Sequence, residues 1–212
     1  MAQAMASSPR GLTIKDRKRQ VTRDAVLDAV VEVIGDRGFD FSVQDVADRA
    51  GIAHRTVYRH FPTREALVDA VAERFESGVA MNRLGEAETL QALLDELDVL
   101  YAWFDSEADL VHAVAVKTLA TGKRTGPSQR RSEHWRGVLK AAYPNLAAED
   151  LEPAFIIIRN LLGMVGWHLL TSEPGISSAQ AAQAMRRMVE VALVDLERRD
   201  KEAANAAAGR KS

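Results

Sequence analysis

Apolar residues recur at spacings of three and four along almost the whole chain after residue 20. This is the period of an α-helix that buries one face, and no segment shows the sustained alternation of a half-buried strand. The periodic segments are separated by short stretches that contain glycine, proline or other helix-ending residues. We therefore predict an all-α protein of about nine helices, each of which needs a neighbour to cover its apolar face.

Composition excludes several classes of protein. The 212 residues are 47% hydrophobic, which is enough for a sizeable core and argues against a wholly disordered chain. There is no cysteine, so disulfides, thiolate zinc sites and cysteine nucleophiles are excluded. The most apolar run, residues 154–170, is interrupted by Arg159 and Asn160 and is too short to span a bilayer, so we expect a buried helix and no membrane association. The N-terminus does not resemble a signal peptide, and we expect a cytoplasmic protein.

Charge is distributed unevenly along the chain. The formal net charge is −2, yet the segment from Arg10 to Arg64 holds eleven Lys/Arg against eight Asp/Glu. Its first part, up to Arg23, contains six basic residues and one acid, Asp16. Such a basic arm can lie along or inside a DNA groove. The alternative is that a charged chain end serves only solubility.

The stretch "SVQDVADRAGIAHRTVYRHF", residues 42–61, has the spacing of a helix-turn-helix. Ser42 and Asp45 form the signature of a capping box, which begins one helix. Gly51 supplies the left-handed conformation that ends this helix. A second short helix then follows and cannot continue cleanly past Pro62. In a helix-turn-helix, the second helix enters the DNA major groove.

A helical wheel divides the second helix into two faces. Val57 and Phe61 fall together, where they can dock on the preceding helices, and Tyr58 lies on the flank. The opposite face carries hydrogen-bonding side chains without a single acid. These are Arg55, Thr56, Arg59 and His60. Such side chains bind base edges and phosphates. The alternatives are an ordinary helical corner with a hydrated polar face, or a helical ligand-binding or scaffolding protein whose helix-turn-helix contacts protein.

The segment "FSVQDVADRAGIAHRTVYRHFPTREALVDAV", extended back through "TRDAVLDAVVEVIGDRGFDF", resembles the N-terminal signature of the TetR family of bacterial transcription regulators. The resemblance covers roughly residues 22–72. It implies a sequence-specific DNA-binding homodimer, most often a repressor released from a palindromic operator by a small molecule. It implies no enzymatic activity and no cofactor.

The resemblance also implies roles for particular residues. Four side chains would face the major groove: His54, Arg55, Thr56 and Arg59. Four would hold phosphates: Ser42, Tyr58, His60 and Arg64, the last in place of the family's usual lysine. The family often has serine or threonine at Ala53, so either His54 caps this helix or the cap is missing.

Beyond the fourth helix the resemblance gives only a general architecture, an effector-binding bundle with a dimer formed by its last two long helices. Glycines in the apolar run permit close helix approach, and the last helix carries a broad apolar stripe. We expect the dimer interface to include Gly163, Gly166, Met185, Met188, Ala192 and Leu196. The alternative is that these residues fill the monomer core.

Aromatic residues cluster between residues 101 and 167, as a pocket for an apolar or aromatic effector requires. The candidate ligand contacts are Trp103, His112, Trp135 and Trp167. Each of them can equally be a packing residue. No GxSxG, HExxH or Walker-type motif occurs, so we predict no catalytic and no metal-binding residues.

Four regions follow from these patterns. We expect a flexible basic arm (1–20), a helix-turn-helix DNA-binding domain (21–65), a helical effector-binding and dimerisation domain (66–200) and a disordered tail (201–212).

Overall fold

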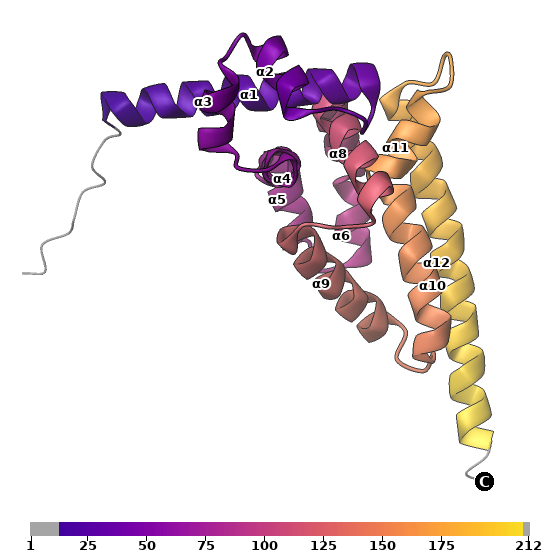
Figure 1. Cartoon of the computed structure of the whole chain (residues 1–212). Coiled ribbons are helices and arrows are strands. Elements are labelled where there is room, and N and C mark those ends of the chain that lie inside the picture. The colour runs from indigo at the N-terminus through magenta and orange to yellow at the C-terminus, as the bar shows by residue number, and fades with distance from the viewer. Residues whose placement is uncertain (1–12, 210–212) are drawn as a thin grey trace, which may run out of the picture. The chain divides into compact units, whose positions relative to one another are not determined.

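The computed structural model describes residues 13–209, and within this range it contains twelve helices and no strand (Figure 1). This confirms the predicted all-α fold, with three more helices than expected. The chain divides after Leu67 into two compact units. Residues 1–12 of the expected arm and residues 210–212 of the expected tail lie outside the described range.

The first unit is built from three helices and the beginning of a fourth. These are α1 (Ile14–Arg37), α2 (Val43–Ala50), α3 (His54–His60) and the first residues of α4 (Arg64–Glu76). Helix α2 packs on α1, and α3 packs on α2. Their core consists of aliphatic side chains and one phenylalanine that have almost no exposed surface: Val26, Val30, Ile34, Val46, Val57 and Phe61. Two of them, Val57 and Phe61, are the side chains that were predicted to dock on the preceding helices.

The N-terminal basic segment is helical where the structure describes it. Helix α1 begins at Ile14, so the prediction of a flexible arm is wrong for residues 14–20. Thr13 accepts a hydrogen bond from the Asp16 amide, and the Asp16 carboxylate accepts one from the Thr13 amide. This capping box explains the early start, because it satisfies amides at the helix N-terminus.

The turn between α2 and α3 has the predicted geometry. Ser42 and Asp45 form the expected capping box at the start of α2. Gly51 ends the helix with φ 64° and ψ 28°, the left-handed conformation that favours glycine. Arg49 of α2 forms ion pairs with Glu32 and Asp36 of α1, so its charge is neutralised within the unit.

The second unit contains the rest of α4 and eight further helices. These are α5 (Val79–Glu86), α6 (Leu90–Asp95), α7 (Leu97–Ser106), α8 (Ala108–Thr121), α9 (Gly126–Ala142), α10 (Ala148–Leu162), α11 (Met164–Thr171) and α12 (Ser178–Gly209). The apolar run 154–170, which was expected to form one buried helix, is divided in two at Gly163, where α10 ends and α11 begins.

Helix α7 lies at the centre of the second unit, packed on α12 and on α5. Its Tyr101 and Phe104 are fully buried with stacked rings, 5.8 Å between centroids. The Tyr101 hydroxyl donates to the Leu161 carbonyl at 2.8 Å, and burial raises the pKa of this phenol. A buried polar group is therefore satisfied at the helix break.

The break between α10 and α11 bends the chain by 53°. A Cβ built on Gly166 would lie 2.0 Å from the Leu161 carbonyl oxygen, so this close approach requires glycine. In the described residues, no single helix is long and apolar enough to cross a membrane. Taken together, α10 and α11 meet the criterion of length and apolar composition, although the chain is bent between them. A buried core helix meets the same criterion.

Helix α12 is longer than expected and continues to Gly209. The prediction of a disordered tail is therefore wrong for residues 201–209. Ion pairs one turn apart support its last turns, including Arg198 with Glu202 and Lys201 with Glu197. The end of the helix is also rich in alanine, which has a high intrinsic helix propensity.

We predict opposite effects for two glycine-to-alanine substitutions. Gly166→Ala should lower the free energy of unfolding by at least about 2 kcal/mol, because the new methyl group meets backbone. Gly137→Ala, in the interior of α9 with nothing within 4 Å of the new Cβ, should raise it by about 0.5–1 kcal/mol. Urea unfolding at fixed protein concentration measures both. Equal stabilities would show that the break does not depend on close approach.

Candidate DNA-binding surface and ligand cavity

Helix α3 presents the polar face that the sequence predicted. Its Val57 is fully buried and the following Phe61 nearly so, which fixes the rotation of this short helix. Arg55 and Arg59 are exposed on the other side, and Thr56 and His60 are half-buried. The docking side and the outward side are thus the predicted ones.

The two arginines of α3 have no partner for their charge among the described residues. In the described part of the chain, neither Arg55 nor Arg59 has an ion pair or a side-chain hydrogen bond, and they lie one turn apart. Arg37 and Arg49 of the same unit are both paired with carboxylates. Arg37 and Arg49 are therefore neutralised within the unit, whereas Arg55 and Arg59 are free to bind an external partner.

The start of α3 has no side-chain cap. Ala53 is the N-cap residue and no side chain accepts from the first turn, so His54 does not replace the missing hydroxyl. The His54 ring instead packs edge-on against Tyr58, with 4.6 Å between centroids. Tyr58 keeps 43% of its surface exposed. This contact holds the phenol beside the outward arginines.

His60 lies in a positively charged environment. Burial lowers the pKa of its imidazole, and the nearby Arg59, Arg19 and Arg23 lower it further. Arg23 also lies over the Phe61 ring at 4.6 Å. The basic end of α1 is therefore close to the end of α3, and a positive field covers this part of the unit.

Arg64 has a structural role that sequence reasoning did not predict. Its guanidinium donates to the Phe41 carbonyl at 3.0 Å and to the Phe39 carbonyl. It also lies over both phenylalanine rings, at 4.2 and 4.4 Å from their centroids. These contacts tie the start of α4 to the turn between α1 and α2. The same guanidinium is thus already occupied where a phosphate contact was expected.

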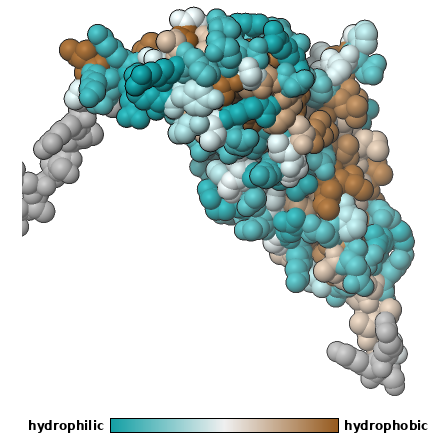
Figure 2. Space-filling model, in the orientation of Figure 1, coloured by the Kyte–Doolittle hydropathy of each residue, from teal (hydrophilic) through white to brown (hydrophobic). Residues whose placement is uncertain are grey.

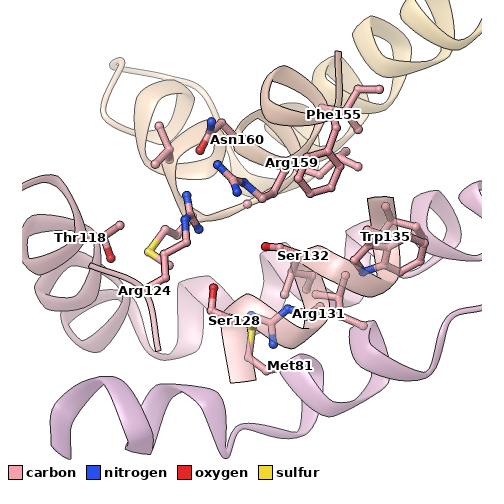
Figure 3. Close-up of a pocket in the computed structure, with 18 of the residues that line it drawn as sticks. Met81, Thr118, Arg124, Ser128, Arg131, Ser132, Trp135, Phe155, Arg159 and Asn160 are labelled. Carbon is pink, nitrogen blue, oxygen red and sulfur yellow. The ribbon is translucent and has the colours of Figure 1, made fainter. Parts of the chain in front are cut away.

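The second unit contains a partly open cavity of about 120 Å³ between α9, α10 and the helices around α7 (Figure 3). Its walls are mostly apolar, with Leu84, Leu93, Phe104 and Phe155 among them. Side chains with polar groups also line it: Thr118, Arg124, Ser128, Arg131, Ser132, Trp135, Arg159 and Asn160. A concave, mostly apolar space with a few polar groups is the usual form of a small-molecule site.

Of the four expected ligand residues, the structure places one in this cavity. Trp135 lines it, whereas the other three do not. Trp103 packs on Phe75 at 5.3 Å between ring centroids. Trp167 is buried and donates to the Ser178 hydroxyl at 2.8 Å, and the His112 ring lies 5.2 Å from that of His168. These three residues are packing residues, which was the stated alternative.

Three polar residues of the lining were missed because they lie in a loop or in the run that was expected to be a buried helix. Arg124 lies in the α8–α9 loop, and Arg159 and Asn160 lie in α10. One signal was present in the sequence. A charged and an amide side chain interrupt its most apolar run, which is costly unless they serve a purpose.

The expected dimer residues differ in their exposure. Gly166, Met185 and Leu196 are buried within the single chain, as the alternative of a role in the monomer core predicts. Gly163 forms the helix break. Met188 is 57% exposed and Ala192 is partly exposed, so both remain available to a partner.

An exposed apolar surface crosses the three helices α10, α11 and α12, which pack on one another. Figure 2 shows this apolar surface over the region of α10–α12. We call it the apolar stripe. Its members are Ile156, Ile157, Leu169, Met188, Val191 and Val194. Contiguous apolar surface of this kind marks a protein interface.

Comparison with known proteins matches the first unit to a family model. Residues 26–71 match the model of "Bacterial regulatory proteins, tetR family". An HTH-type transcriptional repressor of Mycobacterium tuberculosis, Rv3405c, is 27% identical over 152 residues, 71% of this chain and 74% of that protein. The HTH-type transcriptional repressor KstR2 of Rhodococcus jostii is 28% identical over 155 residues, 65% of this chain and 74% of that protein.

Solved structures share the fold of most of the chain. A TetR-like transcriptional regulator from Rhodococcus sp. RHA1 has a TM-score of 0.63 at 20% identity, covering 82% of this chain and 96% of that one. A TetR family transcription regulator from Marinobacter aquaeolei VT8 has a TM-score of 0.58 at 20% identity, covering 83% and 97%.

We predict that Arg64→Ala destabilises the protein. It removes two hydrogen bonds to backbone carbonyls and two cation–π contacts, which should cost about 1–3 kcal/mol of unfolding free energy. Arg55→Ala removes an exposed arginine without a partner and should change stability by less than about 0.5 kcal/mol. Chemical denaturation of both variants measures the difference. Equal stability would contradict a structural role for Arg64.

Proposed function

Since the chain belongs to the tetR family of bacterial regulatory proteins, we propose that it is a transcriptional repressor that binds double-stranded DNA through helix α3. Two of its relatives are named transcriptional repressors. We propose that it acts on chromosomal DNA in the cytoplasm. The family is regulatory, and no enzymatic role is proposed.

The outward face of α3 is the observation that carries this proposal. Arg55 and Arg59 are exposed and unpaired, while the buried Val57 on the other side fixes their direction. An arginine can bind the O6 and N7 acceptors of guanine with two hydrogen bonds, and Thr56 can contact a neighbouring base. We propose that these three residues, with His54, read the major groove.

Contacts to the DNA backbone would position this face. We propose that Tyr58, His60 and Ser42 bind phosphates, and that the basic end of α1 adds long-range attraction. We leave Arg64 out of this set, because its guanidinium is held by the Phe39 and Phe41 carbonyls. Arg64 instead positions the start of α4 on the unit that carries α3.

A seven-residue reading helix contacts too few base pairs for specific binding, so we propose a homodimer that binds two half-sites of a palindromic operator. The apolar stripe on α10–α12 supports this proposal. Met188 and Ala192, two of the six residues expected in the interface, lie on or beside it. The buried members of that set would support the interface from within the chain.

We further propose that a small molecule in the cavity of the second unit lowers DNA affinity. By linkage, a ligand does so only if it binds more tightly to a conformation whose two reading helices fit the operator poorly. The cavity is bordered by α10, which also carries part of the apolar stripe. A change of cavity shape can therefore reach the dimer through one helix.

Selection of bound duplexes from a random DNA pool tests the function as a whole. We expect a palindromic sequence with two half-sites, bound with an affinity that falls steeply with salt. Failure to bind any duplex at low salt would overturn the proposal. It would leave the alternative that the helix-turn-helix contacts protein.

We predict that Arg55→Ala and Arg59→Ala each weaken binding to the selected duplex by about 1–3 kcal/mol and relax its sequence preference at one position per half-site. Competition with single-base variants of the duplex measures both effects. Arg130→Ala, which removes an exposed arginine from α9, is the matched control and should leave affinity and preference unchanged. A loss that is equal for all sequences would assign both residues of α3 to phosphates.

We predict that Val191→Glu dissociates the dimer. Val191 is 66% exposed within the apolar stripe, and a carboxylate buried there without a partner should weaken association at least about tenfold. Sedimentation velocity over a concentration series measures this change. Leu119→Glu, at an exposed apolar position of α8, is the control. The same dimer affinity in both variants would remove the stripe from the interface.

A further inference from the structure

Four of the polar side chains that line the cavity, those of Arg124, Arg131, Arg159 and Trp135, can only donate hydrogen bonds, and three of these are positively charged. None of the described lining residues is acidic. The lining includes the guanidinium groups of Arg124, Arg131 and Arg159, which approach one cavity from the α8–α9 loop, α9 and α10. Like charges in a partly buried space repel one another, and burial adds a desolvation cost.

Arg131 is neutralised within the protein. It pairs with Glu76 at 2.9 Å, and the Thr125 hydroxyl donates to the other oxygen of the same carboxylate at 2.7 Å. Both partners of the pair are largely buried, with 17% and 7% of their side-chain surfaces exposed. This pair leaves the cavity with two guanidinium groups whose charge no lining carboxylate balances.

Arg124 and Arg159 are those two groups. In the part of the chain that the structure describes, neither guanidinium donates a hydrogen bond or forms an ion pair, and the buried Arg159 Nε has no partner. The carboxylate of Glu152, on the same helix as Arg159, is bound by Arg136 with both oxygens. Figure 3 shows Arg124 and Arg159 extending into the same space.

The energetics of these two arginines agree with their geometry. Burial lowers the pKa of the Arg124 guanidinium and Arg131 lowers it further, while the nearby Glu76 acts in the opposite direction. Burial also lowers the pKa of Arg159, followed by the effects of Arg124 and Arg136, while Glu152 acts in the opposite direction. Both groups stay charged at neutral pH, because guanidinium does not deprotonate in proteins. Holding these two charges in the cavity therefore carries a desolvation cost that a bound anion would offset.

Neutral donors continue the same pattern. The buried Trp135 Nε1 has no hydrogen-bond partner, and Ser128 and Ser132 of the same helix line the cavity. An indole N–H can only donate a hydrogen bond. The cavity therefore offers charged and neutral donors to an acceptor, beside walls of leucine and phenylalanine.

We propose that this cavity binds a small organic anion, a carboxylate with an apolar body, whose charged group lies between Arg124 and Arg159. The apolar body would pack on Leu93, Phe104 and Phe155. This inference rests on the proposed function only in treating the cavity as the effector site. The evidence that the effector is negatively charged is independent of that function and consists of the unpaired arginines.

The size of the cavity limits the apolar body. A cavity of about 150 Å³ lined by aliphatic and aromatic side chains holds one benzene molecule. The present cavity of about 120 Å³ therefore suits a single ring or a chain of similar volume. Benzoate combines such a ring with one carboxylate and serves as the probe.

Calorimetric titration of the full chain with three probes tests the proposal. Benzoate carries both the ring and the charge, benzamide carries the ring without the charge, and acetate carries the charge without the ring. We expect benzoate to bind at least about tenfold more tightly than either of the others, the factor typical of a hydrogen-bonded charge. Equal affinity for benzamide, equal affinity for acetate, or no binding of benzoate would each overturn the proposal.

Two variants locate the charged group. Arg159→Gln in α10 and Arg124→Gln in the loop should each lose at least about tenfold in benzoate affinity and keep their affinity for benzamide. Arg130→Gln, an exposed arginine of α9 outside the cavity, should bind benzoate like the parent chain. Unchanged benzoate affinity in either cavity variant would remove that arginine from the site and overturn the proposal.

Stability without ligand provides a second measurement. Because each substitution removes an unpaired, partly buried charge, the thermal midpoint of both variants should equal or exceed that of the parent chain in the absence of benzoate. A lower thermal midpoint would show that these arginines stabilise the protein without ligand, and would overturn the argument from unbalanced charge.

The two proposals can fail independently. Binding of benzoate without affinity for any duplex would overturn the proposed function and leave the anion site standing. Binding of a selected palindrome without binding of benzoate would overturn the anion site and leave the DNA-binding function standing. Release of that palindrome by benzoate but not by benzamide would support both.

Discussion

The burial of Val57 and Phe61 is the constraint on which the first unit depends. Helix α3 has only seven residues, too few to be stable alone in water, so it exists because these two side chains are enclosed. Their burial also determines which residues face outward. Gly51 ends α2 and sets the direction of the chain toward α3. Arg64, at the start of α4, is held by a hydrogen bond to the Phe41 carbonyl. The surface proposed to read DNA is thus a consequence of packing.

The treatment of charge differs between the scaffold and the proposed sites. Arg49 joins two helices through two carboxylates, and Lys117, although buried, has Asp69 at 3.4 Å. Paired charges of this kind hold elements together or limit the cost of burial. By contrast, Arg55 of α3 and the two cavity arginines lack acidic partners among the described residues. Unbalanced charge therefore appears at the places where a negatively charged partner is proposed, a phosphate in one unit and a carboxylate in the other.

Helix α10 connects the two proposed properties of the second unit. Arg159 and Phe155 lie on its cavity side, while Ile156 and Ile157 belong to the apolar stripe. The bend at Gly163 and the close approach at Gly166 allow the chain to continue into α11 without a long loop. A ligand that moves α10 would therefore act on the cavity and on the dimer surface together, as an effector of DNA binding requires.

The sequence by itself determined the local structure of this protein and much of its likeness to a family. Periodicity, the capping box at Ser42 and the glycine at position 51 are short-range features, so the helix-turn-helix and the faces of α3 could be predicted correctly. Only the tertiary structure decided which distant residues meet. It brought Arg124 and Arg159 into one cavity, removed Trp167 from it, and enclosed Met185 in the core. The physical reason is that a helical period specifies which side of a helix is apolar, but not which neighbour covers it.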